Sequence, residues 1–100
     1  MHVVIWRFRP RVGSQGRFRE AYGVDGSWSK LFRKSPDHLG TELLCAASDS
    51  QQYLTIDRWR SAKSYEAFLS ARRDEYDALD RACEDLTEFE EFVGRFDSLC

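Results

Sequence analysis

The stretch YLTIDRW, residues 53–59, carries the clearest fold signal in this sequence. Its β-branched and aromatic residues favour a half-buried strand. Strand alternation places one set of side chains on one face (Tyr53, Thr55, Asp57, Trp59) and a second set on the other (Leu54, Ile56, Arg58). Ser48-Asp49-Ser50 supplies turn chemistry, and residues 39–47 (LGTELLCAA) form a second candidate strand. We therefore predict an antiparallel β-hairpin.

A long helical pattern follows this strand and begins at Ser61. Its apolar residues recur every three or four positions from Tyr65 to Leu86. An unbroken helix over residues 61–86 would be about 39 Å long. The strands that it must cover span only about 30 Å. We therefore expect a break or bend near Ser70 to Asp74.

The N-terminal third predicts one strand and two short helices. Residues 3–9 (VVIWRFR) alternate between one face (Val4, Trp6, Phe8) and another (Val3, Ile5, Arg7, Arg9). Ser14 is a predicted N-cap for the first helix, and Gly23 is its predicted left-handed stop. Ser27 is the predicted cap of the second helix, which ends before Pro36.

Residues 88–96 are compatible with two structures. One apolar set fits a helix (Leu86, Phe89, Val93, Phe96), and another fits a strand (Phe92, Gly94, Phe96). A central glycine weakens either element. Periodicity therefore leaves both alternatives open.

A final strand would give the order βαββαβ, the ferredoxin-like arrangement of the α+β class. That fold has a four-stranded antiparallel sheet with helices on one face. The other face would carry Val3, Ile5, Leu54 and Ile56, which are too apolar to face water. A second copy of the chain is the simplest cover, so we expect a homodimer.

Composition indicates a single globular domain over residues 1–100, with 42% apolar and 32% charged residues. No apolar run reaches the roughly 18 residues of a membrane span. Residues 1–11 lack the apolar core of a secretion signal, so we expect a cytoplasmic protein without a membrane partner. Cys45, Cys83 and Cys100 are few and widely spaced, which predicts free thiols and no metal site.

Charge is distributed unevenly along the chain. Residues 1–34 contain eight Lys or Arg and two Asp or Glu, whereas residues 35–100 contain seven and fifteen. The whole chain has a net charge of −2, which argues against a nucleic-acid partner. Pairing between the basic first strand and the acidic last segment accounts for the imbalance.

Five segments in this order resemble the antibiotic biosynthesis monooxygenase family, within the dimeric α+β barrel superfamily. They are VVIWRFR, YGVDGSW, YLTIDRW, SAKSYEAF and LTEFEEFVGRF, and together they span about residues 3–97. The resemblance implies a final β-strand and a homodimer whose two sheets face each other. It also implies a small-molecule pocket between each sheet and its own helices.

The family includes oxygenases of electron-rich phenols, hydroquinones or anthrones that use no metal, flavin or haem. The resemblance therefore implies a cofactor-free monooxygenase with a small aromatic substrate. Asp57 and Tyr65 are the expected catalytic residues. The expected substrate-binding residues are Trp6, Trp28, Thr55, Trp59 and Phe68, and Phe32 is an alternative to Trp28. Polyketide-oxidising members have an Asn where this chain has Thr55.

Several alternatives stay open. The chain could be a non-catalytic ligand-binding or structural member of the superfamily. Asp57 could instead form an ion pair, for example with Arg72 or Arg73. Haem-degrading relatives use a helix histidine, and the corresponding helix here has none. We expect His38 to be exposed and His2 to have no role.

Overall fold

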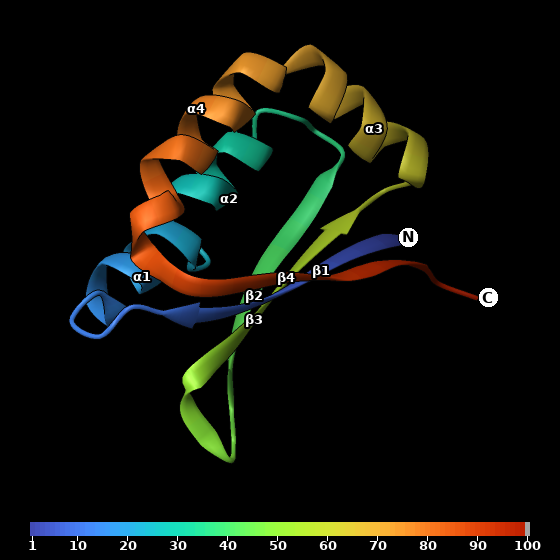
Figure 1. Cartoon of the computed structure of the whole chain (residues 1–100). Helices are drawn as coiled ribbons and strands as arrows, with labels where there is room; N and C mark the ends of the chain where they lie inside the picture. Colours follow the sequence, from blue (N-terminus) through green and yellow to red (C-terminus); the bar gives the residue numbers. More distant parts are fainter. Residues whose placement is uncertain (100) are drawn as a thin grey trace.

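The computed structural model describes residues 1–99 and forms one sheet with its helices on one side (Figure 1). The elements are β1 (His2–Pro10), α1 (Gln15–Tyr22), α2 (Ser27–Phe32), β2 (His38–Ala46), β3 (Asp49–Trp59), α3 (Ala62–Ala71), α4 (Arg73–Cys83), the 3-10 helix η1 (Glu84–Leu86) and β4 (Thr87–Asp97). The last segment is therefore a strand. The order of elements confirms the ferredoxin-like α+β fold.

The sheet has the strand order β2-β3-β1-β4, and each neighbouring pair is antiparallel. β2 and β3 form the predicted hairpin, joined by a turn at Ala47 and Ser48. On β1 and β3, Val4 lies opposite Asp57 and Trp6 lies opposite Thr55. These pairs occupy the helix-covered face, so the alternation predicted for β3 places its polar and aromatic side chains beneath the helices.

A bulge in β4 explains why periodicity could not assign this segment. Gly94 pairs with Ile5, but the next residue on β1, Trp6, pairs with Phe92, which leaves Val93 as the extra residue. Phe92 consequently contacts the Trp6 ring, with the two centroids 5.2 Å apart on the helix-covered side. Phe96 lies opposite Val3 on the other face. The bulge therefore separates two phenylalanines that simple alternation puts together.

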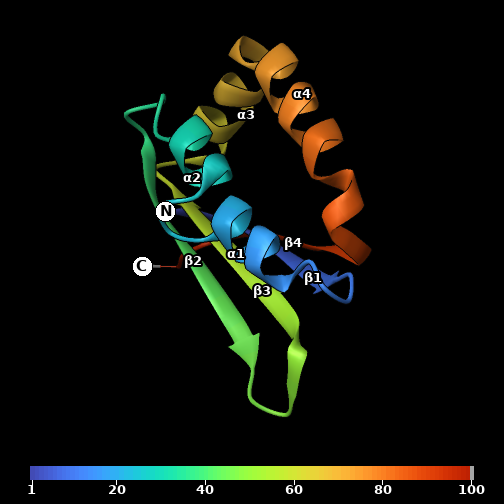
Figure 2. The ribbon, with the colours of Figure 1, turned by 90° about the vertical axis from the view of Figure 1, so that its left-hand side faces the viewer.

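The predicted break in the long helix is present at Arg72, where the backbone leaves helical geometry (φ −120°, ψ 26°). Ser61 begins α3 as a capping box, because its side chain accepts from the Ser64 N–H and the Ser64 side chain accepts from the Ser61 N–H. Figure 2 shows α3 and α4 forming an arch above the sheet.

The helix ends in the N-terminal third differ from the prediction. Gly23 is extended (φ −73°, ψ 177°), so it is not a left-handed stop. A Cβ there would lie 2.6 Å from the Arg19 carbonyl oxygen, and this close approach accounts for the glycine. Ser14 makes no side-chain cap bond, and Gly26 rather than Ser27 is the N-cap of α2.

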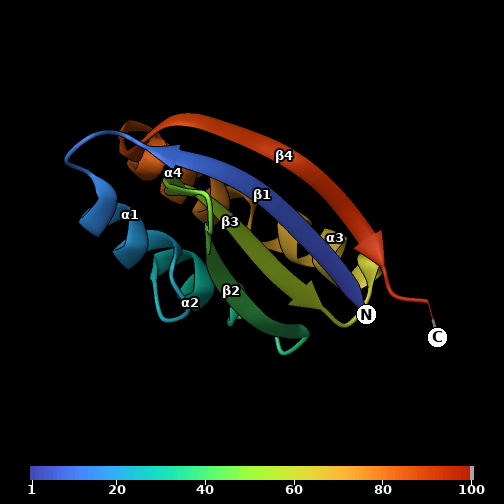
Figure 3. The same cartoon turned by 90° about the horizontal axis from the view of Figure 1, so that it is seen from below.

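The face of the sheet opposite the helices is visible in Figure 3. Val3, Ile5, Leu54 and Ile56 are half-buried there. Leu44 and Phe96, which the register places on the same face, are 40% and 50% exposed. Ion pairs such as Arg7–Glu91 (2.8 Å) also lie across the strands of this face. It is thus an apolar strip with charged surroundings.

His2 is buried, contrary to the expectation of a terminal residue without a role. It is 2% exposed, and its Nδ1 lies 2.7 Å from Asp97 Oδ1. Arg95 Nε donates to His2 Nε2 at 2.9 Å, so the imidazole proton lies on Nδ1 and is donated to Asp97. The histidine therefore fastens the start of β1 to the end of β4.

Within residues 1–99, no helix is long and apolar enough to cross a membrane. Cys45 is exposed and Cys83 is buried, and both are free thiols as predicted. Cys100 lies outside the described residues.

Candidate functional site

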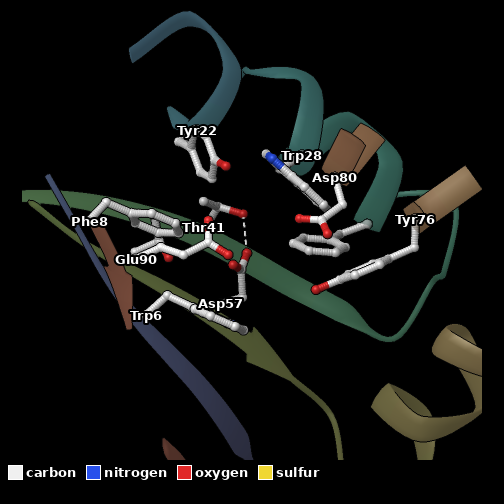
Figure 4. Close-up of a pocket in the computed structure, with 11 residues that line it drawn as sticks. Trp6, Phe8, Tyr22, Trp28, Thr41, Asp57, Tyr76, Asp80 and Glu90 are labelled. Carbon is white, nitrogen blue, oxygen red and sulfur yellow. Dashed lines mark hydrogen bonds between the residues drawn. The ribbon is translucent and has the colours of Figure 1, made fainter. Parts of the chain in front are cut away.

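A cavity lies between the sheet and helices α1, α2 and α4 (Figure 4). Its lining consists of Trp6, Phe8, Tyr22, Trp28, Phe32, Thr41, Thr55, Asp57, Tyr76, Asp80 and Glu90. About 50 Å³ of it can hold the centre of a water molecule. One water needs about 10–15 Å³ by this measure, so the cavity has room for a few waters.

The bend at Arg72 determines where the cavity forms. Beneath α3 the space is filled, because Trp59 packs against Phe68 with ring centroids 5.1 Å apart. Beyond the bend, α4 runs past α2 towards the start of β4 (Figure 2). Trp28 of α2 and Tyr76 of α4 meet edge to face at 5.0 Å. They close one side of the cavity.

The remaining apolar wall comes from the sheet and α1. Phe8 and Tyr22 are 4.7 Å apart between ring centroids, and Trp6 and Phe8 are stacked at 6.2 Å. These rings lie in the cavity lining, and a flat ring could stack against them. Such a wall suits an aromatic ligand.

Asp57 is held in the cavity wall by two neighbours. Its Oδ1 accepts a short hydrogen bond from the Thr41 hydroxyl and lies 3.1 Å from His38 Nε2. With its proton on Nε2, His38 is the second donor to this oxygen. No hydrogen bond to Oδ2 occurs among the described residues. One carboxylate oxygen is therefore fixed, and the other is left for a ligand.

His38 differs most from its predicted position. Its side chain is 1% exposed, and its ring lies 5.0 Å from Trp59 and 5.4 Å from Phe32 between centroids. The expectation of an exposed histidine was wrong, because the strand begins at His38 and turns the side chain under α2. The ion partner of Asp57 is accordingly His38 and not an arginine of the bend.

Two further carboxyl groups enter the cavity from α4 and β4. Figure 4 shows Asp80 near Tyr76 and Glu90 on the opposite side of the cavity, beside Phe8. Partial burial, and then the nearby Asp80, raise the pKa of the Glu90 carboxyl although much of the residue is exposed. Burial is also the main cause of the raised pKa of the Tyr76 phenol. Glu90 therefore keeps its proton to a higher pH than an ordinary glutamate.

The structure brings together four of the seven predicted site residues, namely Trp6, Trp28, Thr55 and Asp57. Trp59, Tyr65 and Phe68 lie outside the cavity lining. Trp59 is 0% exposed and packs against Tyr65 as well as Phe68. Tyr65 faces the other way, with the Arg95 guanidinium 5.0 Å from its ring centroid. This group lies under α3, where helix and sheet are in close contact.

Other lining residues were not singled out from the sequence. Tyr76 and Asp80 are four residues apart in the helical pattern, so their shared face could have been inferred. Glu90 lies opposite Phe8 in the sheet. Its position follows from the β4 bulge and could not be inferred from alternation.

The structure is a ferredoxin-like α+β domain with a cavity between its sheet and its helices. The sequence profile for antibiotic biosynthesis monooxygenase matches residues 1–93, and the chain therefore belongs to that family. Both findings confirm the resemblance predicted from the sequence. Among curated proteins, none matches this chain.

Solved structures share this fold at low sequence identity. A Nitrosomonas europaea protein assigned to the same family is 18% identical, with a TM-score of 0.74 over 100% of both chains. SnoaB, a cofactor-independent oxygenase from Streptomyces nogalater, is 16% identical, with a TM-score of 0.71 over 99% of this chain and 93% of that chain. A variant of MhuD with two manganese protoporphyrin IX molecules bound per active site is 17% identical, with a TM-score of 0.74 over 100% and 96%. These likenesses establish the fold alone.

The residues of this cavity do not fit a porphyrin. His2 and His38 are both engaged in buried hydrogen bonds, and neither lines the cavity. The lining also contains no Lys or Arg to pair with propionate groups, whereas it contains three carboxyl groups. Within residues 1–99, no three His, Cys, Asp or Glu side chains are grouped to hold a metal ion.

Proposed function

We propose that this protein is a monooxygenase that oxidises a small electron-rich aromatic molecule with O₂, without a cofactor. The substrate would be a phenol, hydroquinone or anthrone bound in the cavity. The observation that carries the proposal is Asp57, whose carboxylate has one fixed oxygen and one oxygen without a hydrogen bond beside an aromatic wall. Membership of the monooxygenase family and the likeness to SnoaB support it.

Asp57 is the proposed general base. Thr41 and His38 hold Oδ1, so the carboxylate cannot rotate freely, and Oδ2 takes the proton from a substrate hydroxyl or an acidic C–H group. Removing this proton makes the aromatic system a better electron donor. The cavity walls exclude bulk water and hold the ring in place.

The proposed reaction balances without an external reductant. The substrate anion passes one electron to O₂, and the resulting radical and superoxide combine to form a C–O bond. For an anthrone-type CH₂ group, the peroxide O–O bond then breaks. One oxygen stays as the carbonyl, and the other leaves as water with the two hydrogens of the CH₂ group. Protonated Asp57 returns its proton to the leaving oxygen.

The other predicted site residues take two kinds of role in this proposal. Trp6 and Trp28 hold the substrate ring, and Thr55, two residues before Asp57 on β3, offers a hydroxyl to a substrate oxygen. Trp59, Tyr65 and Phe68 lie outside the cavity and pack against one another, so we assign them a structural role.

The test is oxygen uptake with a panel of hydroquinones and anthrones. We expect the native protein to consume O₂ with at least one of them, and Asp57→Asn to lose at least about a hundredfold in kcat, within the usual range for removal of a general base. Asp85→Asn, an exposed carboxylate outside the cavity, is the matched control. Ligand binding without oxygen uptake would instead favour a non-catalytic binding protein.

We also propose that the chain forms a homodimer through the open face of its sheet. The partly exposed apolar strip with Val3, Ile5, Leu44 and Phe96 supports this. Light scattering at micromolar concentration should give twice the chain mass, and Leu44→Glu should shift it towards the monomer. A native protein that is monomeric under these conditions would contradict the proposal.

A further inference from the structure

We propose that the ligand of this cavity carries a positively charged amine beside its aromatic ring. The proposal names the substrate class of the site and so rests on the proposed function of the cavity. It is carried by the charges of the lining together with its aromatic side chains. Three carboxyl groups, those of Asp57, Asp80 and Glu90, enter the cavity, and no Lys, Arg or His lines it.

The carboxyl groups of Asp80 and Glu90 line the cavity although both residues are partly exposed, and neither takes part in an ion pair among residues 1–99. Some acidic side chains near them in the fold are paired, whereas Glu84 and Asp85 are not paired within the described part of the chain. Glu91, the neighbour of Glu90, binds Arg7 at 2.8 Å, and Glu75 on α4 binds Arg72 at 2.8 Å. What distinguishes Asp80 and Glu90 from the other unpaired acids is that they line the cavity.

These unpaired carboxyl groups affect one another. Asp80 contributes to the raised pKa of Glu90, as expected for like charges brought together in a partly buried place. A cation in the cavity would relieve this repulsion. An anionic ligand, in contrast, would add a further negative charge.

The aromatic wall provides a second attraction for a cation. Trp6, Trp28 and Tyr76 present ring faces or edges to the cavity, and indole is the strongest of the natural rings for cation–π binding. The chain already uses one of these rings in this way, because the Arg73 guanidinium lies 5.7 Å from the Tyr76 centroid. Arg73 is not a lining residue, so it leaves the interior of the cavity without a cation.

The indole N–H of Trp28, in the cavity wall, could donate a hydrogen bond to an acceptor on the ligand. The indole N–H of Trp28 is buried and has no hydrogen-bond partner among the described residues. Trp28 itself is 7% exposed and lines the cavity. A hydroxyl or carbonyl oxygen on the ligand ring would satisfy this donor.

The test compares three probes of similar size and different charge. They are 2-phenylethylamine (cation), 2-phenylethanol (neutral) and 3-phenylpropionate (anion), each titrated at pH 7 while the fluorescence of the protein's Trp residues is recorded. We expect the amine to bind about tenfold more tightly than the alcohol, a factor that a partly desolvated cation–π contact and a screened ion pair can supply. The carboxylate should bind most weakly.

Variants locate the charge preference. Asp80→Asn and Glu90→Gln should each reduce the amine-to-alcohol preference about threefold or more, with little change in the affinity for the alcohol. Asp85→Asn, which is exposed and outside the cavity, should leave both affinities unchanged. An affinity for the amine that does not exceed that for the alcohol would overturn the inference. A preference that survives in both cavity variants would overturn it as well.

The outcomes separate this inference from the proposed function. Oxygen uptake with neutral hydroquinones in a protein that shows no amine preference would leave the monooxygenase proposal standing and would refute the amine proposal. If the protein bound the amine selectively but consumed no O₂ with any substrate, including hydroxylated phenylethylamines, the amine proposal would stand. The monooxygenase proposal would then be refuted. Failure of all three probes to bind would count against the cavity as a site for such a ring.

Discussion

Replacement of Trp59 tests whether the end of β3 is a structural centre or part of the ligand site. Trp59 is 0% exposed and contacts Phe32, His38, Tyr65 and Phe68. Truncation of a buried Trp to Ala costs about 3–5 kcal/mol of the free energy of unfolding. For a domain of this size, each kcal/mol lowers Tm by about 4–8 °C. Trp59→Ala should therefore lower Tm by about 12–40 °C, with the larger values unfolding the protein at ambient temperature.

Trp59→Phe is the informative second variant. The Trp59 indole N–H is buried without a hydrogen-bond partner among the described residues. Loss of an unsatisfied buried donor returns about 1–3 kcal/mol, which offsets part of the lost packing. We expect this variant to fold, with a Tm within about 10 °C of the native value. Because Trp59 lies outside the cavity lining, its ligand affinity should be unchanged.

Thermal and urea denaturation followed by circular dichroism give the stability, and titration of 2-phenylethanol gives the affinity. If Trp59→Ala had the same free energy of unfolding as the native protein, the packing described above would be refuted. A folded Trp59→Phe with native stability and a severalfold loss of affinity would place Trp59 in the site and contradict the cavity boundary.

Three further perturbations have defined outcomes. Gly26→Ala would place a Cβ 2.4 Å from the Glu20 carbonyl oxygen, so we expect the free energy of unfolding, measured by urea denaturation, to fall by about 1–3 kcal/mol. A variant as stable as the native protein would contradict this close approach. His2→Ala removes the partner of Arg95 and Asp97 and should cost about 1–3 kcal/mol, measured in the same way. Since folding raises the pKa of Glu90, its deprotonation disfavours the folded state and stability falls as pH rises through that range. Glu90→Gln should therefore have a higher Tm than the native protein at pH 7 and little difference at pH 4, and equal melting at both would argue against a raised pKa.

The sequence was most informative where a single period extends over a whole element. The alternation of β3 placed Thr55 and Asp57 on the helix-covered face, and a comparison of lengths predicted a break near Ser70 to Asp74, which the structure has at Arg72. Both inferences need only the rise per residue and the side-chain period. The family resemblance then assigned β4, which periodicity had left open.

Sequence reasoning failed where one residue changes the local register or where contacts are distant in the chain. The extra residue Val93 reverses the alternation of β4, so the cavity position of Glu90 could not be derived. His38 and Asp57 are nineteen residues apart and meet only because β2 pairs with β3. The site boundary at Trp59 depends on how closely α3 packs, which a pattern of apolar residues does not specify.

The bend at Arg72 also separates two kinds of evolutionary constraint within one apolar pattern. Residues of α3 bear on the packed end of the sheet, so substitutions there are limited by stability. On α4, Tyr76 and Asp80 line the cavity, and Tyr76 also packs against the core. Their identity can change with a smaller cost in folding, and each change alters the shape or charge met by a ligand. In a single straight helix, the residues that pack on the sheet and the residues that line the cavity would lie on one rigid element. With the bend, residues on one short helix can alter the cavity wall while the packed end of the sheet is kept.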